Sequence, residues 1–494
     1  MKNLLSKIII LSAFIALFIS CSSSDSATPT PVDTKPTISS FSPQSAGLGS
    51  TITITGTNFS TTAANNVVTI NGVTATVTAA TATQLSVTVP ACSGTGDVKV
   101  TVGSTTATAA SQFTFVSPPT ITSIWPLSGG YGSTVVITGT NFSTTAANNK
   151  VTINGVDATV TAATATQLTV TVPACGGNGT VNVALGSAII TGPTFTYIPD
   201  VFAVGYDGKY AMLWKNGIAT ALTDGTHNAE ATSVFVVGGD VYVAGFQTGL
   251  FNVAKVWKNG TATALTDGSK VAQATSLYVV GNDVYVAGFE DTGNHSVAKV
   301  WKNGVATALT DGSKGAEATS LYVVGNDLYV GGWEGTPYAN VAKVWKNGVV
   351  MNLGTTDAVV RSLYVVGSDL YAAGAKNGIP TVWKNGNATT LANSGYINSI
   401  YVSGTDVYVA GTDGNRAKVW KNGVATALTD GTKYANGNSV FLYGSDVYVG
   451  GNEDPFTIGN NPTYKAIAKV WKNGVATNLT NGSDSAIVLS IVVR

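Results

Sequence analysis

Between Tyr206 and the C-terminus, apolar and polar residues recur in one pattern, and every copy contains Trp-Lys-Asn-Gly. The copies begin at seven tryptophans: Trp214, Trp257, Trp301, Trp345, Trp383, Trp420 and Trp471. Self-similarity at a period of roughly 40 residues is typical of propellers, solenoids or arrays of small units. Within the unit that starts at Ser276, the pattern predicts four strands, over residues 276–280, 284–288, 297–302 and 305–310.

The order of these strands favours a propeller blade. The first two are apolar almost throughout, as expected for strands buried on both faces. The last two alternate, as at a half-exposed edge. Asn303-Gly304 predicts a two-residue hairpin turn, because both residues tolerate positive φ. A gradient from buried inner strands to wet outer strands fits a blade better than a solenoid coil, and we expect the repeated tryptophans to pack between blades.

The two ends of the repeat region predict a closed ring. Residues 200–205 match the second strand of a unit, and the first strand of that unit is missing there. Residues 490–493, at the C-terminus, match a first strand. The last strand can therefore complete the first blade, which leaves only short, protected sheet edges. We predict an all-β seven-bladed propeller over residues 200–494.

The N-terminus predicts export and a lipid anchor. Residues 1–20 form a signal sequence, with Lys2 and Lys7 before an apolar run that is too short to span a membrane. The residues that end in Cys21 resemble the bacterial lipobox, which implies lipid attachment to Cys21; the alternative is an ordinary signal peptide. Ser22 resembles lipoproteins that are passed to an outer membrane. Residues 21–35 predict a disordered tether, rich in Ser, Thr, Pro and Asp.

Residues 36–116 and 119–198 are two copies of one domain, offset by 83 positions throughout. Short Thr- and Val-rich strands punctuated by Gly and Asn predict a small β-sandwich. Residues 36–43, 47–59, 68–72 and 85–90, and their counterparts, resemble the IPT/TIG family of immunoglobulin-like domains. The resemblance implies spacers or interaction modules outside the cytoplasm. In the second copy we expect Trp125 to take the place of Phe41.

Composition narrows the classes of function. The chain carries 26 basic and 26 acidic residues, and no basic stripe, which argues against nucleic-acid binding. Cys92 and Cys175 are equivalent positions in the two sandwiches. A bridge between them would need Cα atoms within about 7 Å, so we favour two unpaired thiols.

The sequence predicts no catalytic site, metal site or cofactor. His227 occupies a loop position where other copies carry Lys270, Lys314 and Lys433, and His295 has no ligand partner nearby in sequence. No zinc-protease, nucleophile-elbow or phosphate-loop motif is present. The recurring Asp-Gly pairs lack the alternating carboxylates of a calcium loop, so we interpret them as turns. We therefore interpret the protein as a non-enzyme.

Comparison of the repeats predicts where a ligand binds. The first-to-second and third-to-fourth turns are nearly constant, whereas the second-to-third and fourth-to-next connections vary. In an up-and-down blade these two classes lie on opposite faces of the disc, and binding residues concentrate on loops held by a rigid scaffold. Our ligand-binding candidates on this diversified face are Tyr206, Tyr210, Phe251, Glu290, Asp291, Trp333, Glu334, Tyr338, Asn340, Phe456 and Tyr464.

Aromatic rings beside amides and carboxylates suit a sugar, and they also suit a protein partner. The layout resembles Bacteroidota surface glycan-binding lipoproteins, in which immunoglobulin-like spacers carry a binding domain. We therefore expect a monomeric outer-membrane lipoprotein that binds an extracellular carbohydrate, facing either the cell surface or the periplasm. The alternatives are a protein-binding or adhesion propeller and a propeller polysaccharide lyase. A base and charge-neutralising residues at the centre of the disc would favour the lyase.

Overall fold

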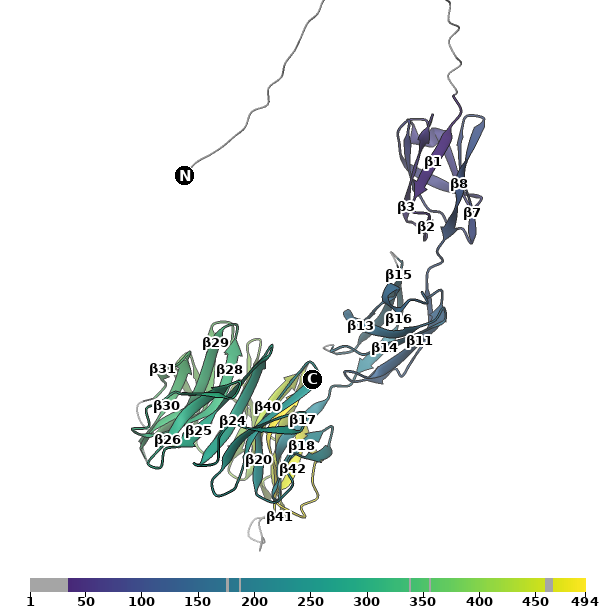
Figure 1. The fold of residues 1–494 in the computed structure, drawn as a ribbon. Helices are drawn as coiled ribbons and strands as arrows, with labels where there is room; N and C mark the ends of the chain where they lie inside the picture. Colours follow the sequence, from purple (N-terminus) through teal and green to yellow (C-terminus); the bar gives the residue numbers. More distant parts are fainter. Residues whose placement is uncertain (1–33, 175–176, 186–187, 337–338, 355–356, 458–464) are drawn as a thin grey trace, which may run out of the picture. The chain divides into compact units, whose positions relative to one another are not determined.

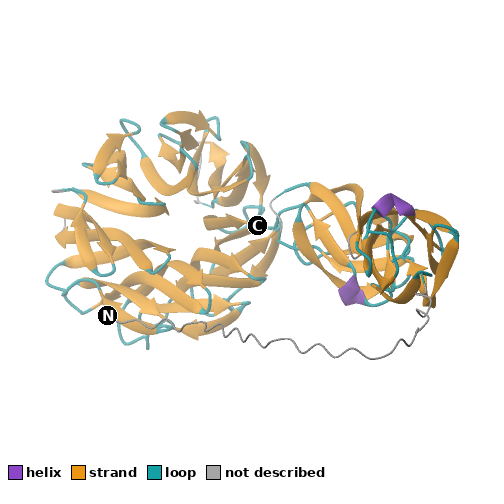
Figure 2. Cartoon of the chain, turned by 90° about the horizontal axis from the view of Figure 1, so that it is seen from above, coloured by secondary structure: helices purple, strands orange, loops and turns teal. Residues whose placement is uncertain are grey.

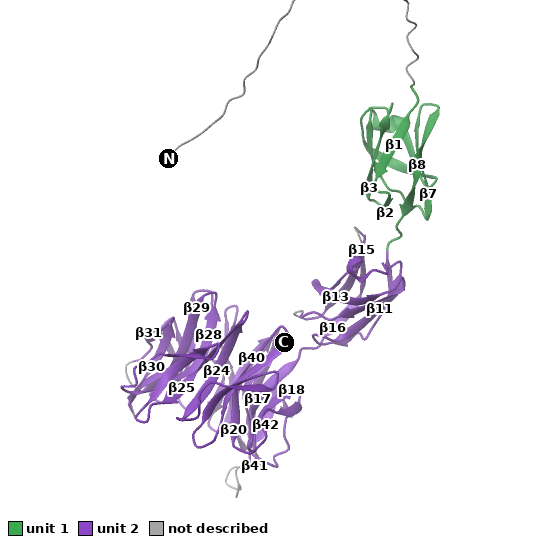
Figure 3. Ribbon diagram, viewed as in Figure 1, with its two compact units in different colours: residues 1–118 green, residues 119–494 purple. Residues whose placement is uncertain are grey.

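The computed structural model describes residues 34–174, 177–185, 188–336, 339–354, 357–457 and 465–494, with only the backbone at 455–457 (Figure 1). Signal residues 1–20, Cys21 with most of its tether, and Cys175 lie outside these ranges. The chain divides into two compact units, Met1–Pro118 and Pro119–Arg494 (Figure 3). Within the described residues, no helix is both long and apolar enough to cross a membrane.

The first unit is an eight-stranded sheet folded on itself around one core. Its order is β1-β3-β6-β5-β4-β7-β8-β2, and β5 pairs with both β6 and β4, so the two layers are continuous. Alternate residues point inward, among them Ile52, Val68 and Phe113. The elements are β1 (Thr37–Ser42), β2 (Ser45–Ala46), β3 (Thr51–Thr57), η1 (Ala63–Asn65), β4 (Asn66–Ile70), β5 (Val73–Ala80), β6 (Gln84–Thr88), β7 (Thr95–Val102) and β8 (Thr105–Phe115).

The second unit begins with a copy of this domain. Its elements are β9 (Thr120–Trp125), β10 (Ser128–Gly129), β11 (Thr134–Thr140), η2 (Ala146–Asn148), β12 (Lys150–Ile153), β13 (Val156–Ala163), β14 (Gln167–Thr171), β15 (Gly179–Leu185) and β16 (Ala188–Tyr197). The expectation for Trp125 was wrong. Phe41 pairs with Ile54, and its counterpart Ile124 pairs with Ile137. Ile124 is buried, whereas Trp125 is 75% exposed, because adjacent residues of a strand point to opposite faces.

The rest of the second unit is the predicted propeller, seven four-stranded sheets arranged in a ring (Figure 2). We number blades 1–7 along the chain. The first, innermost strands are β44 (Ala486–Val493), β20 (Ala229–Val237), β24 (Ala272–Val280), β28 (Gly315–Val324), β32 (Ala358–Val366), β36 (Tyr396–Ser403) and β40 (Lys433–Tyr443). The second strands are β17 (Val201–Asp207), β21 (Asp240–Gln247), β25 (Asp283–Asp291), β29 (Asp327–Thr336), β33 (Asp369–Lys376), β37 (Asp406–Asp413) and β41 (Asp446–Thr457).

The two outer strands complete each blade. The third strands are β18 (Tyr210–Lys215), β22 (Val253–Lys258), β26 (Ser296–Lys302), β30 (Ala339–Lys346), β34 (Ile379–Lys384), β38 (Arg416–Lys421) and β42 (Ile467–Lys472). The fourth strands are β19 (Ile218–Ala221), β23 (Thr261–Ala264), β27 (Val305–Ala308), β31 (Val349–Asn352), β35 (Asn387–Thr390), β39 (Val424–Ala427) and β43 (Val475–Asn478). The fourth strands are exposed at every position rather than at alternate ones.

The ring closes as the sequence predicts. β44 pairs antiparallel with β17, from Val201 opposite Val493 to Asp207 opposite Ala486. Reciprocal backbone hydrogen bonds between Asp200 and Arg494 extend the pairing, at 2.6 and 2.9 Å. The C-terminal strand is therefore the first strand of blade 1.

The repeated Trp-Lys-Asn-Gly forms the same structure in every blade. Trp301 is 1% exposed and packs against blade 2, while Asn303 and Gly304 have φ of 51° and 84°, the values of the predicted hairpin turn. Asn303 accepts from Val284 N and donates to Asp283, each at 2.8 Å, and Lys302 pairs with the same Asp283 at 2.7 Å. We call this Asp-Lys-Asn unit the clasp. The other clasps join Asp200, Lys215 and Asn216; Asp240, Lys258 and Asn259; Asp327, Lys346 and Asn347; Asp369, Lys384 and Asn385; Asp406, Lys421 and Asn422; and Asp446, Lys472 and Asn473.

Candidate functional site

A cavity of about 600 Å³ lies at the centre of the propeller. The early residues of the first strands line it: Thr232, Ser233, Thr275, Ser276, Glu317, Thr319, Ser320, Val359, Val360, Arg361, Ser362, Asn398, Ser399, Asn438, Ser439, Leu489 and Ser490, together with Trp333 from a second strand. The start of each first strand lies beside the end of the second strand, as Glu317 lies opposite Trp333. The cavity is therefore on the side of the disc that carries the diversified connections.

The first strands begin earlier than the apolar pattern predicts. β24 begins at Ala272 rather than Ser276, and its added residues include a bulge between Ala274 and Ser276. The bulge requires a glycine on the second strand, because a Cβ at Gly288 would lie 2.0 Å from the carbonyl oxygen of Gln273. Bulges re-aim side chains and are frequent beside functional sites. Here they point one residue of each blade into the cavity.

A ring of seven serines forms part of the cavity wall and joins each blade to the next. Leu277 N donates to Ser233 Oγ of the preceding blade at 3.1 Å, and Val234 N closes the circle by donating to Ser490 Oγ at 3.3 Å. The remaining acceptors are Ser276, Ser320, Ser362, Ser399 and Ser439. We call this set the serine ring. Because every blade contributes the same bond, the ring gives the cavity a fixed frame.

The bulge residues just before these serines differ between blades. They are Thr232, Thr275, Thr319, Arg361, Asn398, Asn438 and Leu489, and we call them the variable ring. Three threonines and two asparagines donate to the same backbone carbonyl of the next blade, as Thr275 does to Ala318 at 2.7 Å and Asn438 to Val488 at 2.9 Å. Among the described residues, Arg361 and Leu489 make no such bond. Five members of the variable ring thus make the repeated bond to the next blade, and two do not.

Arg361 is the charged member of the variable ring. Its Nη1 donates to Asn398 Oδ1 at 3.1 Å, and its guanidinium lies 5.7 Å from the centre of the Tyr396 ring. Asn398 in turn donates to Gly437 O at 3.0 Å and to Asn438 Oδ1 at 3.3 Å. Solvent reaches the side chain through the cavity, but the surrounding blades lower the pKa of Arg361 by desolvation. Within the described residues, no carboxylate lies within ion-pair distance of this guanidinium.

Glu317 and Trp333 form a second polar group, on blade 4. Burial raises the pKa of the Glu317 carboxyl, and a hydrogen bond from the Trp333 side chain partly offsets that rise. Both side chains are half-buried and line the cavity. The indole N–H of Trp333 is the donor toward this carboxyl, and the face of an aromatic ring can stack on a ligand.

An aromatic row marks the far end of the cavity. Phe235, Tyr278, Tyr322, Tyr364, Tyr401 and Phe441 occupy one position of successive first strands, with neighbouring ring centres 4.6 to 5.1 Å apart. Burial raises the pKa of Tyr278 to about 12 and also raises the pKa of Tyr401. A separate cavity, on the side of the constant turns, is lined by Tyr278, Tyr322 and Tyr364. The aromatic row therefore lies between the central cavity and this second cavity.

The structure brings one sequence-predicted candidate into the cavity, Trp333. Tyr210 and Phe251 are 43% and 39% exposed, and Tyr206 and Asn340 are half-buried on strands. Asp291 accepts from Gly293 N at 2.8 Å and shapes its own loop. Tyr338 and Tyr464 lie outside the described residues, and only the backbone of Phe456 is described, in β41.

Two of the candidate carboxylates have partners within their own blades. Glu290 pairs with Lys299, and Glu334 pairs with Lys343, in each case from the second strand to the third. Lys418 and Asp413 form the same pair in blade 6 at 2.6 Å, and Lys469 pairs with Glu453 in blade 7. These pairs are largely shielded, with side chains 12% to 29% exposed. A ligand that used Glu290 or Glu334 would have to compete with a lysine.

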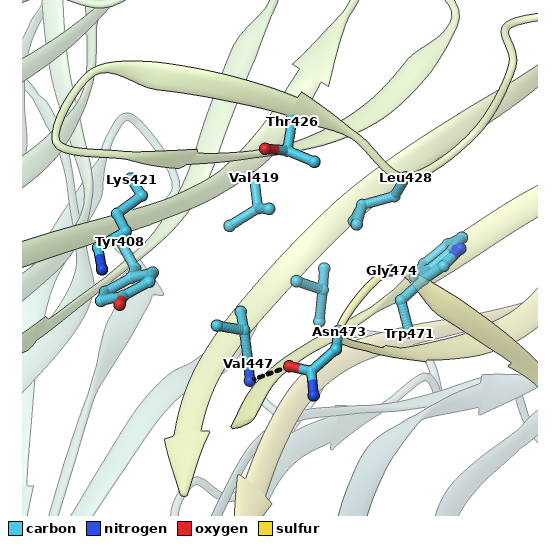
Figure 4. Close-up of a pocket in the computed structure, with 10 residues that line it drawn as sticks. Tyr408, Val419, Lys421, Thr426, Leu428, Val447, Trp471, Asn473 and Gly474 are labelled. Carbon is cyan, nitrogen blue, oxygen red and sulfur yellow. Dashed lines mark hydrogen bonds between the residues drawn. The ribbon is translucent and has the colours of Figure 1, made fainter. Parts of the chain in front are cut away.

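A smaller cavity of about 230 Å³ lies between blades 6 and 7 (Figure 4). Tyr408, Lys421, Trp471 and Asn473 line it, and Asn473 accepts from Val447 N at 2.8 Å. All four residues belong to motifs that recur around the ring. The cavity is therefore a crevice of the repeated packing and does not distinguish these blades from the others.

Other sequence-predicted features have simple structures. His227 and His295 are exposed, and the described residues contain no cluster of three or more His, Cys, Asp or Glu side chains that could hold a metal ion. Asp267 accepts from Ser269 N at 2.9 Å beside Gly268 at φ 77°, which confirms the turn interpretation of Asp-Gly. Cys92 is a free thiol, and burial raises its pKa.

The variable ring was missed from the sequence because its residues precede the apolar run of the first strand. A signal was present: each variable residue stands next to a serine that is the same in all seven repeats. When the repeats are compared, a position that changes next to one that stays constant indicates that the repeated fold does not require a particular residue there.

Comparisons with known proteins add a family for the N-terminal region. No curated protein matches this chain. One similar solved structure is a protein of unknown function from Bacteroides thetaiotaomicron, 15% identical, covering 67% of this chain and 95% of its own, with a TM-score of 0.40. Another is an auxiliary nutrient binding protein from the same organism, 12% identical, covering 67% and 94%, with a TM-score of 0.31.

A third is SGBP-B from a xyloglucan utilization locus in Bacteroides uniformis, 17% identical, covering 45% of this chain and 66% of its own, with a TM-score of 0.18. At these scores the similarity carries no argument about function. The IPT/TIG domain family profile matches residues 36–115 and 119–197. The chain therefore carries two IPT/TIG domains followed by a seven-bladed propeller.

Proposed function

We propose that this protein is an outer-membrane lipoprotein, anchored through Cys21, whose propeller binds an extracellular carbohydrate without catalysis. In this proposal the IPT/TIG domains are spacers, and the lipobox-like residues support the anchor. The central cavity is the observation that carries the binding function. It places the ring of Trp333 beside the hydrogen-bonding groups of Glu317, Arg361 and Asn398. A sugar presents C–H groups that stack on an aromatic ring and hydroxyls that bond to such groups.

The size and frame of the cavity fit this ligand. Small-molecule sites are typically about 300–1,000 Å³ and mostly pre-formed, and the cavity of about 600 Å³ lies in that range. The serine ring holds its wall in place, so little ordering entropy opposes binding. The diversified connections surround its mouth, where Tyr206, Tyr210 and Phe251 remain predicted contacts for the rest of a longer polymer.

Retention on immobilised polysaccharides tests the proposal. Soluble protein beginning at Val32 is compared with two variants, Trp333→Ala in the cavity and Phe251→Ala on the surface loop. We expect Trp333→Ala to lose most retention and Phe251→Ala to retain at least part of it. Retention of no polysaccharide by the folded wild-type protein would reject the carbohydrate assignment.

A protein partner is the second candidate. Leu250 and Phe251 are 91% and 39% exposed, next to each other on the loop between β21 and β22. Exposed apolar residues on a loop are typical of contact sites. Loss of binding to whole cells in Phe251→Ala, with glycan retention absent in every form of the protein, would favour this candidate.

A polysaccharide lyase is the third candidate, because Glu317 and Arg361 both lie at the centre of the disc. A lyase needs a group that neutralises the substrate carboxylate and a base that removes the neighbouring proton. The test is ultraviolet absorbance of the unsaturated product during incubation with acidic polysaccharides. Growth of that absorbance, abolished in Arg361→Thr, would replace the binding proposal with a catalytic one.

A further inference from the structure

The charge of the variable ring points to a narrower class of ligand. At this level of the cavity, six blades present uncharged residues and blade 5 presents Arg361. Five of the six make the hydrogen bond to the next blade that the repeat requires, as Thr319 does to Val360 at 2.8 Å. Arg361 does not make it. Blade 5 therefore lacks the hydrogen bond that five other blades make at this position and carries a cation there instead. We infer that the side chain of Arg361 serves a purpose other than this repeated bond.

The guanidinium is held in place with donors to spare. Asn398 accepts from one of its two Nη atoms, and the ring of Tyr396 lies against it. A guanidinium carries five N–H donors in a planar fork. The bond to Asn398 is the one that the described residues provide, and Asn398 is itself anchored to Gly437 and Asn438. The remaining donors are therefore available to a molecule in the cavity.

The neighbouring carboxylate does not neutralise this cation by an ion pair. Glu317, on the adjacent blade, accepts from Trp333 and lies beyond ion-pair distance of Arg361. Tyr396, which faces Arg361 from blade 6, contributes an aromatic ring and no carboxylate. A cation that lines a cavity without a paired anion favours an anionic occupant. A planar carboxylate fits a guanidinium through two parallel bonds.

We propose that the central cavity selects a carboxylate-bearing sugar, such as a uronic acid residue, with the carboxylate bound by Arg361 and the sugar ring placed against Trp333. This inference rests on the proposed carbohydrate binding and adds its chemical class. The free edge of the guanidinium donates to both carboxylate oxygens. Asn398 keeps the fork oriented, and Glu317 accepts from a ring hydroxyl.

The experiment is calorimetric titration of the soluble protein with three probes: an oligogalacturonate, a sulfated oligosaccharide and a neutral oligosaccharide. The variants are Arg361→Thr, which installs the residue that blades 2, 3 and 4 carry at this position, and Arg361→Lys, which keeps the charge but not the planar fork. Arg416→Thr is the matched control. It removes one positive charge from an exposed site, where Arg416 donates to Asp430 O.

We expect the wild-type protein to bind the oligogalacturonate most tightly, with an affinity that falls as salt is added. Arg361→Thr weakens this binding roughly 10- to 100-fold, as expected for loss of hydrogen bonds to a charged group, Arg361→Lys weakens it less, and Arg416→Thr leaves it unchanged. Thermal unfolding at the wild-type temperature confirms that Arg361→Thr is folded.

Three results would overturn the inference. Tight binding of the neutral probe, equal in wild type and Arg361→Thr, would support carbohydrate binding but reject selectivity for a carboxylate. Arg361-dependent binding of the sulfated probe alone would assign the site to a different anion. Binding of none of the probes would reject the inference together with the proposed function.

Discussion

The clasp and the variable ring show two opposite uses of repetition within one propeller. The clasp joins Asp, Lys and Asn in all seven blades with nearly the same distances, 2.7 to 2.8 Å between Asn and Asp. The variable ring occupies one backbone position in the same seven blades and carries threonine, arginine, asparagine or leucine. The clasp lies at a hairpin turn and the variable ring at a β-bulge, and each of these backbone settings recurs around the ring, so the difference between the two sets is in their side chains.

The difference shows which contacts the fold needs. A bond that recurs in every blade belongs to the repeated fold. A position that varies is one where the fold accepts several residues, and selection can then act on the ligand. The propeller therefore keeps its structural residues at the turns and between blades, and its chemical variety at the centre and on one face.

Removing the closing strand has the largest expected effect. A chain that ends at Ser485 lacks β44, so β17 loses its partner and blade 1 loses its innermost strand. We expect the propeller to lose cooperative unfolding and to aggregate through the open edge. Deletion of Arg494 alone is the control, since it removes two backbone bonds to Asp200 and keeps the strand. Equal thermal unfolding curves for the two truncations would show that the ring does not depend on closure.

Replacement of a repeated tryptophan comes next. Trp301→Ala empties a fully buried site between blades 2 and 3, and large-to-small changes of this kind cost about 3–5 kcal/mol. Trp125→Ala is the control, because that side chain is 75% exposed and its loss should change the free energy of unfolding by about 0.5 kcal/mol or less. Urea unfolding followed by circular dichroism measures both. Similar midpoints would contradict the packing role of the repeat.

The serine ring is expected to give a smaller but measurable loss. Ser276→Ala leaves Leu321 N, in the next blade, without its acceptor. An unsatisfied buried donor costs about 1–3 kcal/mol. Thr261→Ala, on the exposed strand β23, is the matched control within the same propeller. A loss no larger than that of the control would show that the joint between blades does not need this bond.

The sequence predicted the blades and their closure because the evidence for them is local and repeated. Asn303-Gly304 specifies its hairpin by backbone preference, and residues 490–493 match a first strand by pattern alone. The central cavity was harder to predict. Ala272 to Thr275 precede the apolar run of β24, so their pairing with β25 depends on a bulge and on the absence of a side chain at Gly288.

The candidate binding residues show the same limit. Trp333 was found because an aromatic residue at the end of a strand is visible in sequence. Arg361 was not singled out, because its difference from the other blades is apparent only when the residues that all seven blades place at this level of the cavity are compared. The pairing of Glu290 with Lys299 depends on strand register. Composition alone cannot reveal which carboxylates are already paired with a lysine.

The clasp predicts a modest pH dependence. Hydrogen bonds from Lys302 and Asn303 lower the pKa of Asp283 in the folded protein, and Asp240, Asp327 and Asp406 are lowered in the same way. Each such carboxylate stabilises the fold above its unfolded pKa of about 3.9. The stabilisation is lost as pH falls through the lower, folded pKa. We therefore expect the wild-type protein to unfold at a slightly higher temperature than Asp283→Asn at pH 7, and the two to converge near pH 2. A difference that grows on acidification would give the opposite sign and reject this linkage.

Arg361→Thr should have the smallest effect on stability, and that result would sharpen the contrast between the clasp and the variable ring. The new hydroxyl can donate to Ile397 O, the carbonyl that corresponds to the acceptors of Thr232, Thr275 and Thr319. A bond of this kind contributes about 0.5–1.5 kcal/mol, and desolvation of the guanidinium ends at the same time. We expect urea unfolding to show no loss, or a gain of up to about 1 kcal/mol. A loss above about 1.5 kcal/mol would mean that the hydrogen bond from Arg361 to Asn398 is needed to hold blades 5 and 6 together, so the arginine would need no ligand to explain it. A protein that becomes more stable while losing affinity for acidic sugars would instead show that this position is kept for binding at the expense of stability.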